Sequence, residues 1–135
     1  ANLYGANRSG ATGGEPERYG HLLMLLDQPG PIRAYKLVDE DGGSPMAAGN
    51  GYKRIMYEIG KSYEIADADT DPTKDCSTGL HVATMPWVLA NRTSEKQRIL
   101  IVEFTAADIA AIPNSGDGKF RVRRFTVVGE KGAKP

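Results

Sequence analysis

The sequence has only one cysteine and two histidines among its 135 residues. A single cysteine excludes an internal disulfide, which suits folding in a reducing cytoplasm. A structural zinc site needs four Cys or His ligands, more than the chain contains. No apolar run approaches the roughly 20 residues that span a bilayer, and the longest one, at 21–26, lacks the basic start of a signal peptide. We therefore expect a protein made in the cytoplasm, with no metal and no membrane partner.

An excess of either charge is also missing, since 17 basic residues balance 17 acidic ones. The protein therefore has no overall field that would attract nucleic acid, and we expect no nucleic-acid partner. Arg121, Arg123 and Arg124, together with Arg98, form a local basic cluster. Proteins that bind single-stranded nucleic acid interleave aromatic residues with their basic ones, and this cluster does not. We therefore expect the arginines on the solvent face of the last strands, where charge protects a sheet edge from aggregation.

The length is that of one domain. Residues 1–16 are rich in Gly, Ala, Asn, Ser and Thr, and we expect an extended N-terminal arm. Within this arm only Leu3 and Tyr4 offer apolar anchors for a partner. We expect residues 17–128 to form a globular α+β domain and residues 129–135 to form a C-terminal tail.

Hydrophobic periodicity predicts a mainly antiparallel sheet with a few short helices. The expected strands cover 32–38, 52–57, 62–65, 80–83, 98–104 and 119–128, and the expected helical segments cover 17–28, 85–91 and 105–112. The segment 98–104 is apolar on both faces, which is typical of a central strand. Thr105 and Asp108 have the spacing of a capping box.

Two strands carry irregular patterns. In 32–38 the inward side holds Ile32, Ala34 and either Lys36 or Val38. In 119–128 the alternation slips, since Phe120 and Val122 share one face and the pair Phe125 and Val127 follows out of step. A β-bulge at 123–124 would keep both pairs inward.

Cys76 and His81 are the first candidates for chemistry. A catalytic thiolate needs a base within hydrogen-bond reach, but in an extended segment a spacing of five places the two side chains on opposite faces. We therefore expect Cys76 to be a buried apolar side chain and His81 a strand residue bonded to the backbone. Gly79 would supply a backbone angle that other residues avoid.

The acidic segment 66–75 resembles the start of a calcium loop, with Asp67, Asp69 and Asp71 at alternate positions. An EF-hand loop requires Gly at its sixth position and Glu at its twelfth, where this chain has Pro72 and Thr78. We interpret the segment as a solvated acidic loop. No glycine group lies in a strand-to-helix turn suited to a nucleotide, so we expect no cofactor.

Four segments occur in a fixed order: AYKLV at 34–38, CSTGLHVAT at 76–84, ILIVEFTAADIAAIP at 99–113 and DGKFRVRRFTVV at 117–128. Together they resemble a domain of the rIIB-type family of bacteriophage proteins, which also occurs in many small phage proteins of unassigned role. The resemblance covers about 95 of the 135 residues. It implies a phage or prophage origin and no particular chemistry.

Within that resemblance Cys76, Gly79, Leu80 and His81 match the family motif, and we expect these motif residues to be structural. The sequence departs from the family at Ala106, where proline is common, and at Phe125, where tyrosine is usual.

Three functional classes follow. The first is a virion structural protein, namely a capsid decoration or cement protein that binds the major capsid protein or another virion protein, with copies of itself as a further partner. The second is an intracellular, non-enzymatic phage protein of the rIIB type that modulates the host. The third is an enzyme, such as a cysteine hydrolase or an ADP-ribosyl transferase, but the Arg/Ser-Thr-Ser/Glu residue set of such transferases cannot be assembled from this sequence. We expect the first class, with no enzymatic activity and a location in the virion.

Overall fold

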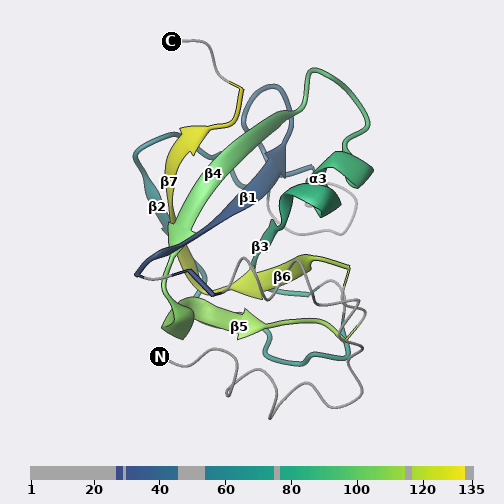
Figure 1. Ribbon diagram of the computed structural model, residues 1–135. Coiled ribbons are helices and arrows are strands. Elements are labelled where there is room, and N and C mark those ends of the chain that lie inside the picture. Colours follow the sequence, from purple (N-terminus) through teal and green to yellow (C-terminus); the bar gives the residue numbers. More distant parts are fainter. Residues whose placement is uncertain (1–26, 29, 46–53, 75–76, 115–116, 133–135) are drawn as a thin grey trace.

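The computed structural model describes residues 27–28, 30–45, 54–74, 77–114 and 117–132. These residues form a seven-stranded sheet in which every pairing is antiparallel, with a short α-helix and a 3-10 turn (Figure 1). In chain order the elements are β1 (Ile32–Val38), β2 (Ser62–Glu64), β3 (Leu80–Ala83), α3 (Met85–Asn91), β4 (Arg98–Phe104), η1 (Ala106–Asp108), β5 (Ile109–Ala111), β6 (Lys119–Val122) and β7 (Arg124–Glu130). The prediction of a mainly antiparallel sheet is confirmed for this part of the chain. The predicted arm and most of the predicted helix at 17–28 lie outside it.

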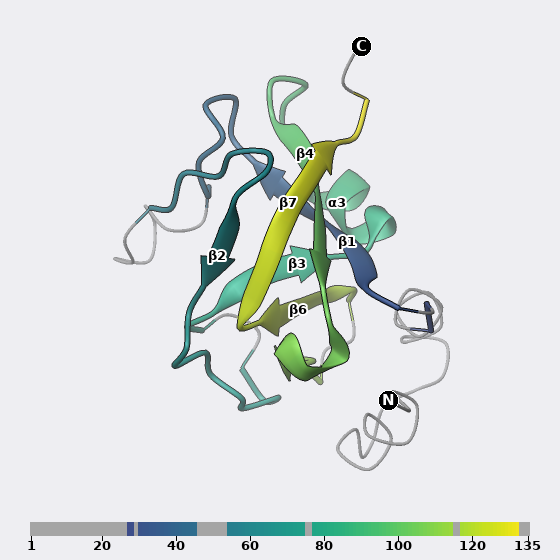
Figure 2. The same cartoon turned by 90° about the vertical axis from the view of Figure 1, so that its left-hand side faces the viewer.

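The sheet consists of two halves that cross each other. Its strand order is β2-β7-β4-β1-β3-β6-β5. Seven register pairs join β1 to β4, whereas a single pair, Tyr35 with Ala83, joins β1 to β3. Figure 2 shows β3 and β6 running across the direction of β2 and β7. The half β2-β7-β4-β1 therefore covers the half β3-β6-β5 much as in an orthogonal packing of two sheets.

The chain passes from one half to the other at Arg123, between β6 and β7. This is where the alternation of the sequence slips. Phe120 and Val122 before Arg123 are buried, and so are Phe125 and Val127 after it. The prediction that both pairs point inward is confirmed, but the irregularity divides two strands of different half-sheets instead of kinking one long strand.

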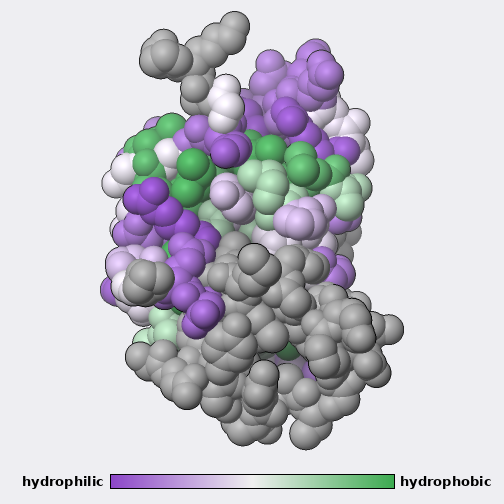
Figure 3. Space-filling model, in the orientation of Figure 1, coloured by the Kyte–Doolittle hydropathy of each residue, from purple (hydrophilic) through white to green (hydrophobic). Residues whose placement is uncertain are grey.

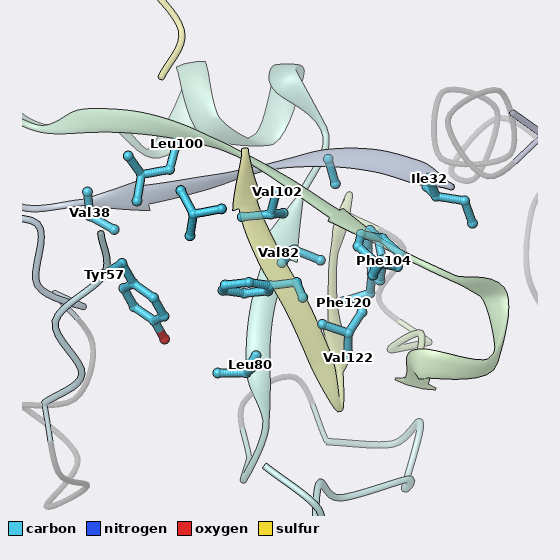
Figure 4. Packing of buried hydrophobic residues seen from close by; sticks show 13 residues of the cluster. Ile32, Val38, Tyr57, Leu80, Val82, Leu100, Val102, Phe104, Phe120 and Val122 are labelled. Atoms are coloured by element: carbon cyan, nitrogen blue, oxygen red, sulfur yellow. The ribbon is translucent and has the colours of Figure 1, made fainter. Parts of the chain in front are cut away.

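The larger hydrophobic core fills the space between the two halves (Figure 4). At one end the rings of Phe104 and Phe120 meet edge to face, with centroids 5.8 Å apart. At the other end Tyr57 packs edge-on against Tyr63 at 4.8 Å. The buried members are Ile32, Ala34, Val38, Tyr57, Leu80, Val82, Leu100, Val102, Phe104, Phe120, Val122, Phe125 and Val127. β4 has a neighbour on both sides, as its apolar sequence predicted.

α3 packs on the opposite side of the sheet. Pro86 stands in its first turn, where a missing N–H costs no helical hydrogen bond. Val88 is fully buried and forms a second, smaller cluster with Ala83 and Ile99. Tyr35 and Leu37 of β1 pack against this cluster, so α3 covers one side of that face.

Two predicted elements differ from the structure. In the described part of 52–57 the only pairing is an isolated bridge between Met56 and Gly43, so no strand forms over residues 54–57. The segment 105–112 begins with the predicted capping box, but the 3-10 turn ends at Asp108 and the chain continues as β5. β7 extends to Glu130, two residues into the segment expected as a tail. Within the described ranges, no helix has the length and hydropathy needed to cross a membrane.

Candidate functional site

The motif residues expected to be structural lie at the start of β3. Gly79 precedes the strand with φ at +148°, and Leu80 is buried in the larger core. His81 follows as the second residue of β3. Cys76, Leu3 and Tyr4 lie outside the described residues, so the structure gives no geometry for a Cys76–His81 pair or for the predicted anchors of the arm.

Lys36 is a buried lysine in the middle of β1. Its side chain points into the larger core together with those of Ile32, Ala34 and Val38, and the residue is only 6% exposed. Its Nζ donates a hydrogen bond to the carbonyl oxygen of His81 at 2.6 Å and lies 5.1 Å from the centroid of the Tyr57 ring. In the described ranges no carboxylate forms an ion pair with it.

The position of Lys36 follows from the way β1 and β3 separate. Beyond the single pair of Tyr35 and Ala83 the two backbones diverge, so the His81 carbonyl needs another donor. The Lys36 ammonium group supplies it. Burial first, and then the positive charge of Lys119, lowers the pKa of Lys36 from 10.5 to about 7. The amine therefore titrates near neutral pH.

The His81 side chain lies on the other face of β3. Leu80 and Val82 point into the larger core, so His81 between them points away from it. In register it stands directly opposite Arg121 of β6. Its Nε2 is buried and has no hydrogen-bond partner within the described part of the chain. Burial, followed by the charges of Lys36, Lys119 and Arg121, lowers the pKa of His81 to about 3, so the ring is neutral at physiological pH.

Arg121 corrects one of the expectations from the sequence. It was predicted on the solvent face, but it is 0% exposed, whereas its neighbour Arg124 is exposed. The guanidinium donates to three backbone carbonyl oxygens of the acidic segment: Nε to Asp69 at 2.9 Å, Nη2 to Asp71 at 2.6 Å and Nη1 to Lys74 at 2.7 Å. Five donors in a fixed plane suit a set of converging acceptors.

The acidic segment is thus built around an internal cation. In a calcium loop, carbonyl and carboxylate oxygens converge on the ion. Here the carbonyl oxygens converge on Arg121, and the carboxylate of Asp69 accepts hydrogen bonds from the Asp71 N–H at 2.8 Å and the Ser77 hydroxyl at 2.5 Å. The Ser77 hydroxyl, followed by the Asp71 N–H, lowers the pKa of Asp69 to about 2. The described residues of the segment other than Ala68 are exposed or half-buried, as expected of a solvated loop, and hydrogen bonds to Arg121 and within the loop hold it in addition.

Gly79 packs against this buried arginine, and this contact gives a test. A Cβ at position 79 would lie 3.2 Å from Cδ of Arg121 and 3.4 Å from Cβ of Ala68, at a φ that side chains rarely adopt. We expect Gly79→Ala to lower the free energy of unfolding by about 1–3 kcal/mol, as measured by urea denaturation. Gly60→Ala is the matched control, because Gly60 has φ at +92° and open space around it. Equal losses in the two variants would mean that crowding against Arg121 contributes nothing.

The outer face of β2, β7, β4 and β1, the side away from the larger core, carries two kinds of surface. At one end lie Tyr35, Leu37, Ile101 and Val128, which we call the apolar band; Val128 is 37% exposed. Figure 3 shows hydrophobic groups across the upper half of the view, with hydrophilic groups above them. At the other end lie two charged pairs at different levels: Arg33 stands opposite Glu103, which is paired in turn with Thr126, and Glu64 stands opposite Arg124, two residues away from Thr126 on β7.

The buried side chains of Lys36 and His81 do not form a catalytic arrangement. The Lys36 amine and the His81 ring lie on opposite sides of the sheet, so the two do not form an acid–base pair. Among the described residues no group of three or more His, Cys, Asp or Glu side chains could hold a metal ion. Comparison of the chain with protein families, characterised proteins and solved structures found no match. The functional argument therefore depends on the residues of this chain.

Proposed function

We propose that this protein acts through protein contacts, as a non-enzymatic structural component of a bacteriophage particle, specifically a capsid decoration or cement protein. The observation that carries the proposal is the apolar band on the outer face of the sheet. Val128 is exposed and Ile101 is half-buried on this face, next to Tyr35 and Leu37, which pack against the α3 cluster. Apolar groups gathered on one face and bordered by polar residues are typical of protein-interaction surfaces. The assignment to a phage particle rests on a second support, which is the resemblance of residues 32–128 to the rIIB-type domain.

The buried polar side chains support the same class of function. Lys36 holds a backbone carbonyl where β1 and β3 diverge, and Arg121 holds three carbonyls of the acidic segment. Both therefore act on the backbone of the fold and stabilise a fixed scaffold. Such a scaffold keeps its outer face in a fixed shape for a partner, and the N-terminal arm is a further attachment proposed from the sequence alone. Extended arms attach to neighbours by main-chain hydrogen bonds, with a few side chains as anchors.

The arm gives a prediction about attachment. We expect deletion of residues 1–16 to abolish binding to the particle and to leave the sheet folded, because the anchors Leu3 and Tyr4 are removed while the core at 32–127 is untouched. Co-sedimentation with particles measures binding, and urea denaturation measures folding. The full-length Leu3→Ala/Tyr4→Ala variant is the control for the anchors. Full binding by the truncated protein would show that attachment uses another surface.

The virion role is tested by counting copies. Quantitative mass spectrometry of purified particles compares the amount of this chain with that of the major capsid protein. Hundreds of copies are expected of a decoration protein, and a handful would indicate a portal, neck or tail component. Absence from the particle would overturn the proposal and direct attention to host partners, the setting of the rIIB-type relatives.

A further inference from the structure

The contact between β1 and β3 has the fewest register pairs of any strand pairing in the sheet. One pair, Tyr35 with Ala83, joins these two strands, whereas four pairs join β3 to β6 and seven join β1 to β4. A continued antiparallel ladder would place His81 opposite Leu37. The His81 carbonyl oxygen instead accepts the hydrogen bond from Nζ of Lys36. We call this contact the β1–β3 joint, which among the described residues combines one backbone pair with one side-chain hydrogen bond.

The described groups around Lys36 provide no negative charge to balance a proton on its amine. The Tyr57 ring lies 5.1 Å from Nζ, and burial raises the pKa of this tyrosine, so its hydroxyl stays neutral. Lys119 of β6 adds a positive charge, and the neutral His81 ring lies on the far face of β3. The core residues of β4 and β7 on this side are apolar, namely Leu100, Phe125 and Val127. A protonated Lys36 is therefore a buried charge, which gains water when β1 and β3 separate.

We propose that the β1–β3 joint is a pH-sensitive device in the fold: a proton on Lys36 favours separation of the two strands, and loss of that proton favours the closed joint. α3 follows β3 after one residue, and Ala83 of the joint belongs to the cluster that contains Val88 of α3. Separation therefore also loosens α3 over Tyr35 and Leu37. The inference goes beyond the proposed function and does not depend on it, because it concerns the folded chain in solution.

The direction of the effect follows from proton binding. In the closed joint the pKa of Lys36 is about 7, and in the open joint, where water reaches the amine, the ordinary value of 10.5 applies. Between these two values the open form binds one proton more than the closed form, so opening becomes rarer as the pH rises. From pH 7 to pH 9 the equilibrium constant for opening should fall about 50-fold. Below pH 7 both forms bind the proton, and the constant levels off.

The test is amide hydrogen exchange of the full chain at single-residue resolution, corrected for the intrinsic exchange rate at each pH. The Thr84 N–H donates to the Gly118 carbonyl beside β6, so by alternation the Ala83 N–H faces β1 and reports on the joint. Its protection should rise about 50-fold between pH 7 and pH 9. It should also remain below the protection of the amides in β4, which has a neighbour on both sides. The range begins at pH 7 because an exposed histidine gains a proton below about pH 6.5.

Variants of Lys36 isolate its proton from other titrating groups. Lys36→Met should remove the dependence on pH, and Lys36→Gln, which keeps a neutral donor, provides a second variant if the first does not fold. Lys61→Met is the matched control, because the Lys61 side chain is exposed, and it should keep the wild-type dependence. Constant protection of Ala83 in the wild type, or an equal dependence in the wild type and the Lys36 variants, would overturn the proposal. So would an Ala83 amide that exchanges as slowly as those of β4, because the joint then has no opening of its own.

Discussion

Replacement of Arg121 by methionine is expected to lower the free energy of unfolding by about 3 kcal/mol or more. Methionine retains much of the buried length of the side chain but offers no donor, so the carbonyl oxygens of Asp69, Asp71 and Lys74 lose their shared partner. The acidic segment should then open to water. Urea denaturation measures the loss of stability, and hydrogen exchange over residues 66–74 measures the opening.

Arg124→Met is the matched control, because Arg124 is the exposed arginine three positions later. Surface substitutions of this kind usually change stability by less than about 0.5 kcal/mol. Arg121→Lys should give an intermediate result, since an ammonium group lacks the planar fork that reaches all three carbonyls. Equal stability of the Arg121→Met and Arg124→Met proteins, with unchanged exchange over 66–74, would refute the role assigned to Arg121.

The second large effect is a dependence of stability on pH that originates from Lys36. The pKa of this lysine is about 7 in the folded protein, against an ordinary value of 10.5. Between these two values the unfolded chain binds one proton more than the folded chain, so stability rises with pH. The slope is about 1.4 kcal/mol per pH unit. Below about pH 7 both states bind the proton, and the contribution of Lys36 becomes constant.

Lys36→Met should abolish this rise, because it keeps the side-chain volume and removes the titrating amine. Urea denaturation of both proteins between about pH 7 and pH 10 gives the two slopes, and their difference isolates Lys36 from the other titrating groups. Higher pH is avoided because burial raises the pKa of Tyr57, and ionisation of this residue in the unfolded chain then acts in the opposite direction. Parallel curves for the two proteins would contradict the assignment.

The strands that the sequence predicted well are those with a strong apolar pattern. β3 and β4 have the predicted bounds, since Leu80–Ala83 and Arg98–Phe104 are bounded by polar or turn residues. The slip between Phe120 and Phe125 correctly indicated a break with inward residues on both sides. It could not show that the break divides two half-sheets, because strand order depends on contacts between distant segments.

The buried cations were harder to predict. Arg121 was expected on the surface because of its charge, but it is buried. Lys36 was predicted only as an alternative to Val38 for the inward position, and both of these residues are buried. The partners of the two cations are backbone carbonyls far away in the chain, and a backbone carbonyl leaves no trace in the residue types. Alternation did signal the inward position of Lys36. The burial of Arg121 could be recognised only once β6 was paired with β3.

The hydrogen bonds from Arg121 to the acidic segment also affect the order of folding events during synthesis. The guanidinium belongs to a residue 47 to 52 positions after the carbonyls that it binds. On a ribosome, residues 66–74 therefore emerge well before Arg121. Their hydrogen bonds to its guanidinium can form only after β6 has been synthesised. A nascent chain that ends before Arg121 has the local hydrogen bonds of Asp69 but lacks the guanidinium that joins the three carbonyl oxygens. The loop therefore reaches its final conformation late in folding, only after the C-terminal strands have been synthesised and paired.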